Sequence, residues 1–250
     1  MPGELPVAAA PWRRLDWDSD FFGIPIGRID LPPDAGREDI EAALRAAREV
    51  GFACLYAEAP FGSPLAVAAG CLPGATLTDV KTTLIRSVRP DENRAFEEGI
   101  RLGAGPEDRG RLEEIVEQVA LMSRFCHDPR FGEPAARRLY REWLRRSLDE
   151  GYADEILVSE RDGGAIGFLT LNRKAEGPAI VLFGVHAAER GRGWGGRLLR
   201  AAVARAAVAG ASQLSVVTQG HNVEALQTYI RNGFNIATAN LFFHLWPEEG

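Results

Sequence analysis

The amino-acid sequence predicts an α/β protein in which a smaller N-terminal domain precedes a larger C-terminal domain. Three observations lead to this fold class. Segments with the apolar period of a helix alternate with short apolar runs typical of strands along most of the chain. Residues 91–105 are polar and rich in glycine, as expected of a boundary between domains. In the second half two strands meet at a tight turn, so its sheet mixes hairpins with parallel crossovers.

The N-terminal domain is predicted to cover residues 1–97. A short strand-like segment, residues 24–31, follows a stretch rich in aromatic residues. Residues 37–51 carry an apolar stripe at helical spacing and end in glycine, which predicts a helix with a glycine C-cap. The apolar run 52–59 predicts a buried strand. Residues 76–88 predict another, because apolar and polar residues alternate in their second half.

The C-terminal domain is predicted to cover residues 98–250, in the order β-α-α-β-β-β-α-β-α-β-β. Pro106 and the two acidic residues after it are a helix-start signal, and Asp162-Gly163-Gly164 is a hairpin turn. The predicted strands lie at 100–103, on both sides of that turn within 154–174, at 177–186, at 213–218 and as a strand pair within 234–246. The predicted helices lie at 106–125, 133–151, 192–209 and 223–232.

The composition argues against several classes of function. The 250 residues have a net charge of −6, whereas a nucleic-acid-binding surface usually brings a basic excess. Cys54, Cys71 and Cys126 are scattered, so we expect neither a disulfide framework nor a metal site. The first 20 residues lack the pattern of a signal peptide, and no apolar run approaches the ~18 residues that span a bilayer. We expect a cytoplasmic protein with no nucleic-acid partner and no membrane insertion.

A loop rich in glycine and arginine, ERGRGWGGR at residues 189–197, connects a predicted buried strand to a helix. Glycines let backbone N–H groups approach an anion, and the positive end of the helix dipole favours phosphate there. A dinucleotide-binding fold would require an acidic residue about 20 positions further on. None lies between Glu189 and Glu224. Two interpretations of the loop remain: a structural turn, or a binding site for a small phosphorylated ligand. Four nearby arginines suit a phosphate-binding site: Arg190, Arg192, Arg197 and Arg200.

Two motifs resemble those of the GNAT acetyltransferase superfamily. The segment VHAAERGRGWGGRLL resembles its acetyl-CoA motif, Q/R-x-x-G-x-G/A, and the segment HNVEALQTYIRNGF resembles its closing motif, N-x-x-A-x-x-x-Y-x-x-x-G-F. The residues that match the first motif are Arg190, Gly193 and Gly195. Those that match the second are Asn222, Ala225, Tyr229, Gly233 and Phe234. The resemblance implies the GNAT fold, a mixed and mostly antiparallel sheet with flanking helices.

Four segments narrow the resemblance to the TDP-fucosamine acetyltransferase (WecD-type) family: LDWDSDFFGIPIGRI, SRFCHDPRF, LYREWLRRS and VTQGHNVEALQTYIRNGFNI. They span nearly the whole chain. The resemblance implies transfer of acetyl from acetyl-CoA to the 4-amino group of a nucleotide-linked 4-amino-4,6-dideoxyhexose. The sequence departs from the family at Thr228, where a basic residue is expected before the tyrosine.

The resemblance also implies roles for individual residues. The backbone of Val185 would face the pantetheine arm and the thioester carbonyl, and Tyr229 would be the general acid that protonates the departing CoA thiolate. The remaining cofactor-binding residues are Arg190, Gly191, Arg192, Gly193, Trp194, Gly195, Gly196 and Asn222. The expected acceptor-binding residues are Phe22, Arg124, Phe125 and Arg130, with Phe131 as an alternative to Phe125.

Each of these residues also has a purely structural interpretation. Asn222 is a good N-cap, and a lone helical tyrosine is usually a core residue. The arginines could be solvated, and residues 123–131 could be a packed loop between helices. His186 and His221 lie near the expected site, but a lone loop histidine is more often a hydrogen-bonded structural residue, so no general base is named. Water could remove the amine proton.

The sequence therefore predicts an acetyl-CoA-dependent N-acetyltransferase acting by direct attack in a ternary complex, since no nucleophilic cysteine is evident. The N-terminal domain is expected to contribute to the acceptor site through WDSDFFG. One alternative is a GNAT enzyme that acetylates a protein or another small amine. A second is a non-catalytic acetyl-CoA-binding module. The C-terminal segment IATANLFFHLW could pair across a homodimer.

Overall fold

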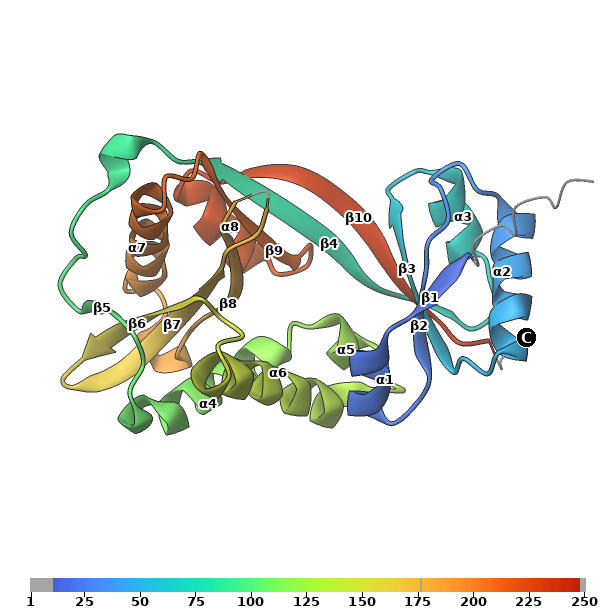
Figure 1. The fold of residues 1–250 in the computed structure, drawn as a ribbon, viewed down its shortest axis with the longest axis horizontal. Coiled ribbons are helices and arrows are strands. Elements are labelled where there is room, and N and C mark those ends of the chain that lie inside the picture. Colours follow the sequence, from blue (N-terminus) through green and yellow to red (C-terminus); the bar gives the residue numbers. More distant parts are fainter. Residues whose placement is uncertain (1–10, 176, 248–250) are drawn as a thin grey trace, which may run out of the picture. The chain divides into compact units, whose positions relative to one another are not determined.

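The computed structural model describes residues 11–175 and 177–247 and divides the chain into two compact units (Figure 1). The first comprises Met1–Thr78 and Asn240–Gly250, of which residues 11–78 and 240–247 are described. The second is Asp79–Ala239. The predicted boundary at residues 97 and 98 falls inside the second unit. The reason is that strand β4 (Ala75–Ser87) begins in the first unit and continues into the second unit, where it pairs with β9 (Gln213–Gln219).

In the described part of the first unit, the strands follow the order β1-β2-β3-β10, with the first residues of β4 next to β10. The β2–β3 pair is parallel, and the β1–β2 and β3–β10 pairs are antiparallel. Its strands are β1 (Trp12–Arg14), β2 (Ile26–Ile29), β3 (Cys54–Pro60) and the end of β10 (Asn235–Leu245). Its helices are α1 (Asp16–Phe22), α2 (Arg37–Glu49) and α3 (Pro64–Gly70). The predicted helix 37–51 and strand 52–59 are thus confirmed as α2 and β3.

Helix α1 is absent from the sequence prediction, which placed only a strand-like segment at residues 24–31, where the structure has β2. Two acidic residues in its first turn suit the positive end of the helix dipole, and Gly23 ends the helix with φ of 72°. The hydroxyl of Ser19 accepts a hydrogen bond from Ile26 N–H at 2.9 Å, which ties the helix to β2. Helix α3 is also absent from the prediction. Both helices have seven residues, too few to show a periodic stripe.

The second unit has the strand order β4-β9-β8-β7-β6-β5. Among its described strands, only the β8–β9 pair is parallel, which confirms the predicted mixed and mostly antiparallel sheet. Besides β4 and β9, the strands are β5 (Ile100–Leu102), β6 (Glu155–Arg161), β7 (Gly164–Asn172) and β8 (Ala179–Val185). The hairpin predicted around residues 162–164 joins β6 to β7, with φ of 53° at Asp162 and 78° at Gly163.

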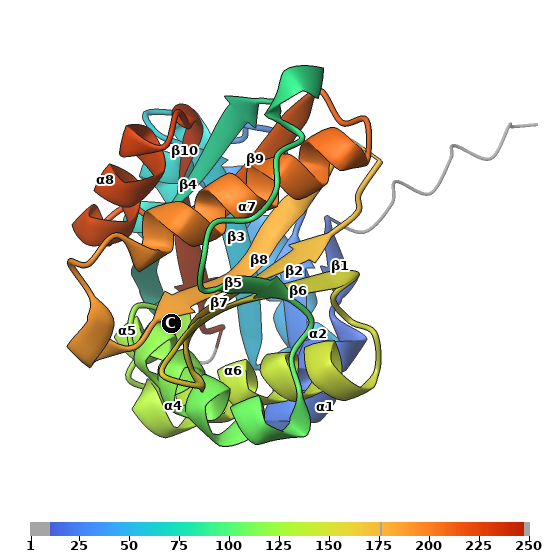
Figure 2. The same ribbon diagram turned by 90° about the vertical axis from the view of Figure 1, so that its left-hand side faces the viewer.

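Helices cover both faces of this sheet, α7 on one face and α4 with α6 on the other (Figure 2). The helices are α4 (Arg109–Ala120), α5 (Arg124–His127), α6 (Gly132–Asp149), α7 (Trp194–Val208) and α8 (Val223–Arg231). Helix α4 packs so closely on β8 that a Cβ on Gly184 would lie 2.7 Å from Ile115. The predicted helix 106–125 is three pieces, a 3-10 turn at Pro106–Asp108, α4 and α5. No helix among the described residues has the length and apolar character to cross a membrane.

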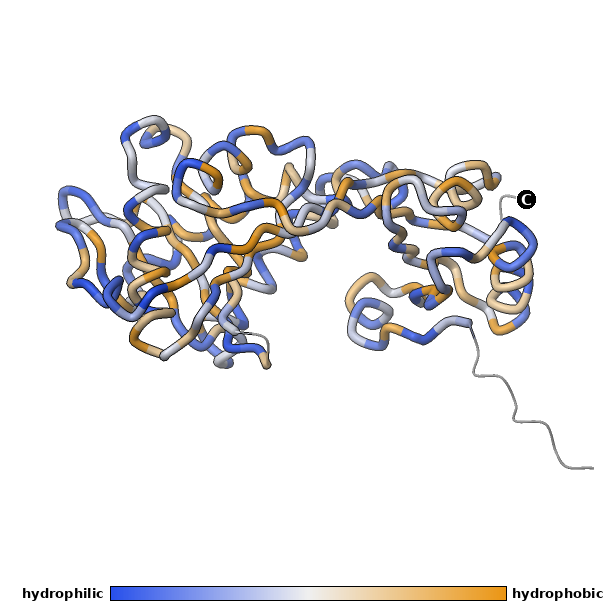
Figure 3. The backbone as a smooth tube through the Cα atoms, turned by 90° about the horizontal axis from the view of Figure 1, so that it is seen from above, coloured by the Kyte–Doolittle hydropathy of each residue, from blue (hydrophilic) through white to orange (hydrophobic). Residues whose placement is uncertain are grey.

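The predicted C-terminal strand pair is wrong, because β10 is one strand of eleven residues. Its first part belongs to the second unit, and Asn240–Leu245 pairs with β3 in the first. The side chains change from exposed to buried near Asn240, and this change of polarity imitates two strands separated by a turn. Each unit has its own apolar core, and hydrophilic loops alternate with apolar elements along both (Figure 3).

Candidate functional site

Strands β8 and β9 lie in parallel at the centre of the second unit's sheet and stay paired for only two positions. Ala179 lies opposite Ser215 and Ile180 opposite Val216, and no register pair follows in the described strands. Val181 and Val217, the next residues on each strand, are 36% and 48% exposed. The strands therefore separate toward their carboxyl ends, and one edge of β8 is open to an extended ligand.

The backbone of Val185 faces this open edge. His186 N–H donates to Ile166 O on β7 at 2.9 Å. Since successive N–H groups of a strand point in opposite directions, Val185 N–H points away from β7. Its carbonyl, on the same side, accepts a hydrogen bond from Arg190 Nε at 3.1 Å. Val185 N–H is therefore directed to the open edge of β8.

The glycine-rich loop leads directly into the N-terminus of α7. Gly191 and Gly193 have φ of 75° and 84°, and a Cβ on either would meet no atom within 4 Å. These two glycines thus serve backbone conformation, with open space in front of them. No side chain caps α7, and Arg197 N–H, bonded to Gly193 O at 3.1 Å, is its first helical donor. The N–H groups before Arg197 are available to an anion, so the loop fits a diphosphate.

Gly195 and Gly196 serve packing between α7 and its neighbours. A Cβ on Gly195 would lie 3.3 Å from Phe183 and 3.6 Å from the methyl group of Thr228. A Cβ on Gly196 would lie 3.4 Å from Asn232 Oδ1. The ring of Trp194 lies against Gly99 and under the guanidinium of Arg197, so its side chain turns away from the loop.

The four arginines of the predicted basic patch differ in their partners. Arg200 forms a two-point ion pair with Glu97 at 2.5 and 3.0 Å, and this pairing lowers the pKa of the Glu97 carboxyl. Arg197 lies 3.6 Å from the same carboxylate. Arg192 lies 3.8 Å from Glu189, which already bonds Arg161 at 2.6 Å, and 59% of the Arg192 side chain is exposed. Arg190 is bound to Val185 O, so Arg192 is the arginine best placed to turn toward a phosphate.

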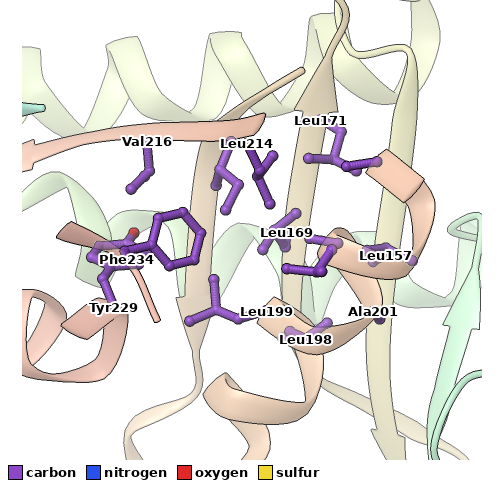
Figure 4. Close-up of a cluster of buried hydrophobic side chains, with 14 of the residues drawn as sticks. Leu157, Leu169, Leu171, Leu198, Leu199, Ala201, Leu214, Val216, Tyr229 and Phe234 are labelled. Carbon is purple, nitrogen blue, oxygen red and sulfur yellow. The ribbon is translucent and has the colours of Figure 1, made fainter. Parts of the chain in front are cut away.

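Asn222 is the N-cap of helix α8, and Tyr229 lies on the helix. Asn222 Oδ1 accepts a hydrogen bond from Ala225 N–H at 3.1 Å, which shows the N-cap. Tyr229, two turns along, is 4% exposed and contacts the rings of Phe183 and Phe234 at centroid distances of 5.8 and 5.6 Å. The ring belongs to the core between α7, α8 and the sheet (Figure 4). Burial raises the pKa of Tyr229 above its ordinary value.

The expected acceptor residues of the second unit lie on and after α5. Phe125 is 1% exposed, with the ring of Phe131 at 5.3 Å and the guanidinium of Arg124 at 4.3 Å, which favours a packing role for this ring. Asp128 is fully buried and accepts the Arg130 backbone N–H at 3.0 Å, while the Arg130 side chain is exposed. Phe22, the remaining expected acceptor residue, lies in the first unit at the end of α1, in edge contact with Phe21.

A cluster of titratable side chains, in which the sequence pointed to His221 and not to Asp79 or His127, lies in the second unit. Asp79 on β4 is 9% exposed, and burial raises the pKa of its carboxyl to about 6, against the opposing charge of Arg124. The imidazole Nδ1 of His221 lies 4.0 Å from Asp79 Oδ1, and the His127 ring lies 4.4 Å from the His221 ring. The sequence does contain a signal for this cluster, because Asp79 is an acidic residue inside the predicted strand 76–88.

The other candidate histidine, His186, has a donor beside each ring nitrogen, and the neutral ring can accept from one of them. The N–H of Ala188 lies 3.4 Å from Nδ1, and the guanidinium of Arg111 lies 3.2 Å from Nε2. These contacts agree with the structural role expected of it.

Comparisons with known proteins place these features in a family context. Residues 153–236 match the family model described as acetyltransferase (GNAT) domain, and this range contains β8, the loop and α8. The dTDP-fucosamine acetyltransferase of Escherichia coli O6:H1 is 29% identical, in a match covering 93% of this chain and 96% of that protein. The spore coat polysaccharide biosynthesis protein SpsD of Bacillus subtilis is 28% identical over 148 residues, 58% of this chain. The match spans only 51% of SpsD, about half its length.

Solved structures share the fold at low identity. The GCN5-related N-acetyltransferase of Kribbella flavida superposes with a TM-score of 0.59 at 16% identity, over 96% of this chain and 88% of that one.

Proposed function

We propose that the chain is an acetyl-CoA-dependent N-acetyltransferase whose acceptor is the 4-amino group of a nucleotide-linked 4-amino-4,6-dideoxyhexose, with TDP as the nucleotide. The observation that carries this proposal is the match to a dTDP-fucosamine acetyltransferase over 93% of the chain. It extends through the first unit, well outside the matched GNAT range. The name of SpsD supports the same broad area, polysaccharide biosynthesis.

Acetyl-CoA would be held by the open edge of β8 and by the loop before α7. The pantetheine arm, which carries amide groups, would run along β8 in place of a paired strand, with Val185 N–H toward the thioester carbonyl. The diphosphate would meet the N–H groups of residues 194–196, with Arg192 as the mobile cation. Gly195 lets α7 approach β8 and α8, which fixes the direction of these donors.

The reaction is a direct attack of the amine on the thioester carbonyl. Val185 N–H stabilises the negative charge that develops on the carbonyl oxygen. As the C–S bond breaks, the Tyr229 hydroxyl gives its proton to the sulfur of the departing CoA. The raised pKa of Tyr229 keeps the hydroxyl protonated throughout the neutral range, so the donor is present in every enzyme molecule. The Asn222 cap fixes the start of α8, and thus the position of Tyr229 two turns later.

An acceptor screen tests the proposal. The purified full-length chain would be given acetyl-CoA with TDP-linked and UDP-linked 4-amino-4,6-dideoxyhexoses of both C4 configurations, a lysine-containing peptide and spermine. Thiol release and product mass would be measured. We expect kcat/KM for one TDP-amino sugar to exceed that for the peptide and for spermine by about 100-fold or more, because the buried polar groups of such a site are left unpaired by the wrong acceptor.

Two outcomes would overturn the proposal. Faster turnover of the peptide or spermine would identify a protein or polyamine acetyltransferase. Acetyl-CoA binding without acetyl transfer to any acceptor would identify a binding module.

A further inference from the structure

Three elements of the second unit bring ionisable side chains to the end of β9. The β4–β9 ladder is antiparallel with Lys81 opposite Gln219, and Gly220 N–H continues it by bonding Val80 O at 2.7 Å. One step further, Asp79 lies opposite His221, with 4.0 Å between the carboxylate and Nδ1. A Cβ on Gly220 would lie 2.8 Å from Val80, so this close approach requires glycine. Backbone register thus holds His221 beside Asp79.

Parallel pairing puts His221 at the same end of the sheet as Val185. Ala179 pairs with Ser215 and Ile180 with Val216, so β8 and β9 run in the same direction. Beyond Ile180 no β8–β9 pair follows in the described strands, and β8 has a register shift against β7 between Ile180 and Phe183. Val185 is the last residue of β8, and His221 follows Gln219, the last residue of β9, by two positions. His221 therefore lies at the end of the sheet that carries the N–H assigned to the thioester carbonyl.

The surroundings of His221 determine which of its nitrogens can act. Nδ1 faces Asp79, and at 4.0 Å the contact is an ion-pair distance that is too long for a direct hydrogen bond. A carboxylate on that side favours the tautomer with hydrogen on Nδ1, which leaves the lone pair on Nε2. The side chain of His221 is 38% exposed while that of Asp79 is 7% exposed, so the imidazole is the member of the pair that can meet a substrate.

The charge states at neutral pH suit proton acceptance. Burial and the neighbouring His127 lower the pKa of His221, so the imidazole is mostly neutral at pH 7. With its pKa near 6, Asp79 is mostly ionised. Among the described residues, Arg124, Lys81 and Tyr140 also interact with Asp79, and burial raises the pKa of Tyr140 to about 12. Once His221 has accepted a proton on Nε2, the ionised carboxylate of Asp79 on the Nδ1 side would stabilise the positive charge of the ring.

We propose that His221 is the general base of the acetyl transfer and that Asp79 is its positioning residue. The amine nitrogen attacks the thioester carbonyl, and the resulting ammonium gives one proton to His221 Nε2. The C–S bond breaks, CoA takes the Tyr229 proton, and the products are amide and thiol. His221 then releases its proton to water, and Tyr229 regains one from water. The inference rests on the proposed function and supplies the base that the sequence did not identify.

The kinetic test uses the chain with His221→Gln or Asp79→Asn, and with His186→Gln as the matched control at a loop histidine whose side chain has no role in the proposed mechanism. At pH 7 we expect kcat of His221→Gln to fall by about 10²–10⁴-fold, with the affinity for acetyl-CoA unchanged by calorimetry. The kcat of the parent protein falls as pH drops through the pKa of His221, and this limb should vanish in His221→Gln. In Asp79→Asn it should move to lower pH, because the imidazolium loses its counter-charge. Imidazole should restore activity to His221→Gly in proportion to its neutral fraction.

An unchanged kcat and acid limb in His221→Gln, or a loss as large in His186→Gln, would overturn the proposal. Its failure is separable from failure of the proposed function, because the kinetic series uses whichever acceptor the screen identifies. If no acceptor is turned over, NMR titration of the His221 ring decides. A His221 pKa below its ordinary value that drops further in Asp79→Asn supports the pair, and a His221 pKa that Asp79→Asn leaves unchanged refutes it.

Discussion

Replacing Tyr229 with phenylalanine separates its two assigned roles, proton donor and core residue. The ring is 4% exposed and contacts Phe183 and Phe234, contacts that phenylalanine retains. The substitution removes one oxygen atom and opens no cavity, so the free energy of unfolding should change by about 1 kcal/mol or less. General acid catalysis contributes roughly 10²–10⁴-fold. Since a thiolate leaves fairly readily, we expect kcat of Tyr229→Phe to fall by about 100-fold.

The pH profile follows from the direction of the pKa shift. A general acid acts in its protonated form, so its activity is lost as pH rises through its pKa. Burial raises the pKa of Tyr229 above the ordinary value of about 10. The parent protein should therefore show no alkaline decline from this group up to pH 10, and its acid limb should be unaffected by Tyr229→Phe.

The assay is single-turnover acetyl transfer, so that chemistry and not CoA release is measured. Thermal unfolding and calorimetry with acetyl-CoA would run in parallel, and Tyr152→Phe, which removes the hydroxyl of a tyrosine that is 37% exposed, would serve as control. A single-turnover rate within threefold of the parent protein would refute the general-acid role and leave Tyr229 as a packing residue.

Three further predictions concern the cofactor loop and the buried acid. Asparagine and aspartate both tolerate the left-handed backbone of Gly193, where φ is 84°, so Gly193→Asn and Gly193→Asp differ mainly in charge. Calorimetry should show near-parental acetyl-CoA affinity for Gly193→Asn and about tenfold weaker binding for Gly193→Asp. Equal affinities would show that this loop does not bind the phosphate. Arg192→Gln should weaken acetyl-CoA binding several-fold at low salt and less at high salt. Arg200→Gln should bind acetyl-CoA normally, because the Arg200 side chain is held by Glu97. A larger loss of affinity in Arg200→Gln than in Arg192→Gln would make Arg200 the phosphate-binding arginine. Asp79→Asn should raise the thermal midpoint of unfolding at pH 7.5, where the buried carboxyl of Asp79 is charged, and change it little at pH 4, where this carboxyl is protonated. Equal changes at the two pH values would contradict the burial of a charged carboxylate.

The sequence predicts the parts of the fold that depend on local pattern. The hairpin at Asp162 and Gly163, the loop before α7 and the cap at Asn222 are all encoded in adjacent residues, and the structure contains each of them. The roles of the individual glycines are not encoded locally. Gly191 and Gly193 are required for backbone conformation and Gly195 for packing against Phe183, and the spacing alone does not separate these reasons.

Features that depend on long-range contacts could not be predicted from one sequence. Strand β10 returns to pair with β3, so the first unit is discontinuous in sequence, and no local signal marks this. The pairing of Arg200 with Glu97 joins residues on opposite sides of the predicted domain boundary. Asp79 and His221 meet only because the β4–β9 ladder brings them level. From the sequence alone, His221 therefore shows no acidic neighbour that would favour the proposed role as a base.

The folding cost of Asp79 bears directly on its role. Because burial raises the pKa of its carboxyl above the unfolded value, the folded state binds a proton more tightly, and stability is lost as pH rises from about 4 to about 6. At neutral pH the ionised carboxylate thus weakens the fold, although asparagine would fit the same space. Arg124 and the backbone N–H groups of Val80 and Gly220 offset part of this cost, and a residue that positions a proton acceptor also needs the charge. Both interpretations predict a more stable Asp79→Asn variant, and they differ in the activity that they predict for it. If Asp79 positions His221, Asp79→Asn is more stable and slower; if Asp79 is only structural, Asp79→Asn is more stable and equally active.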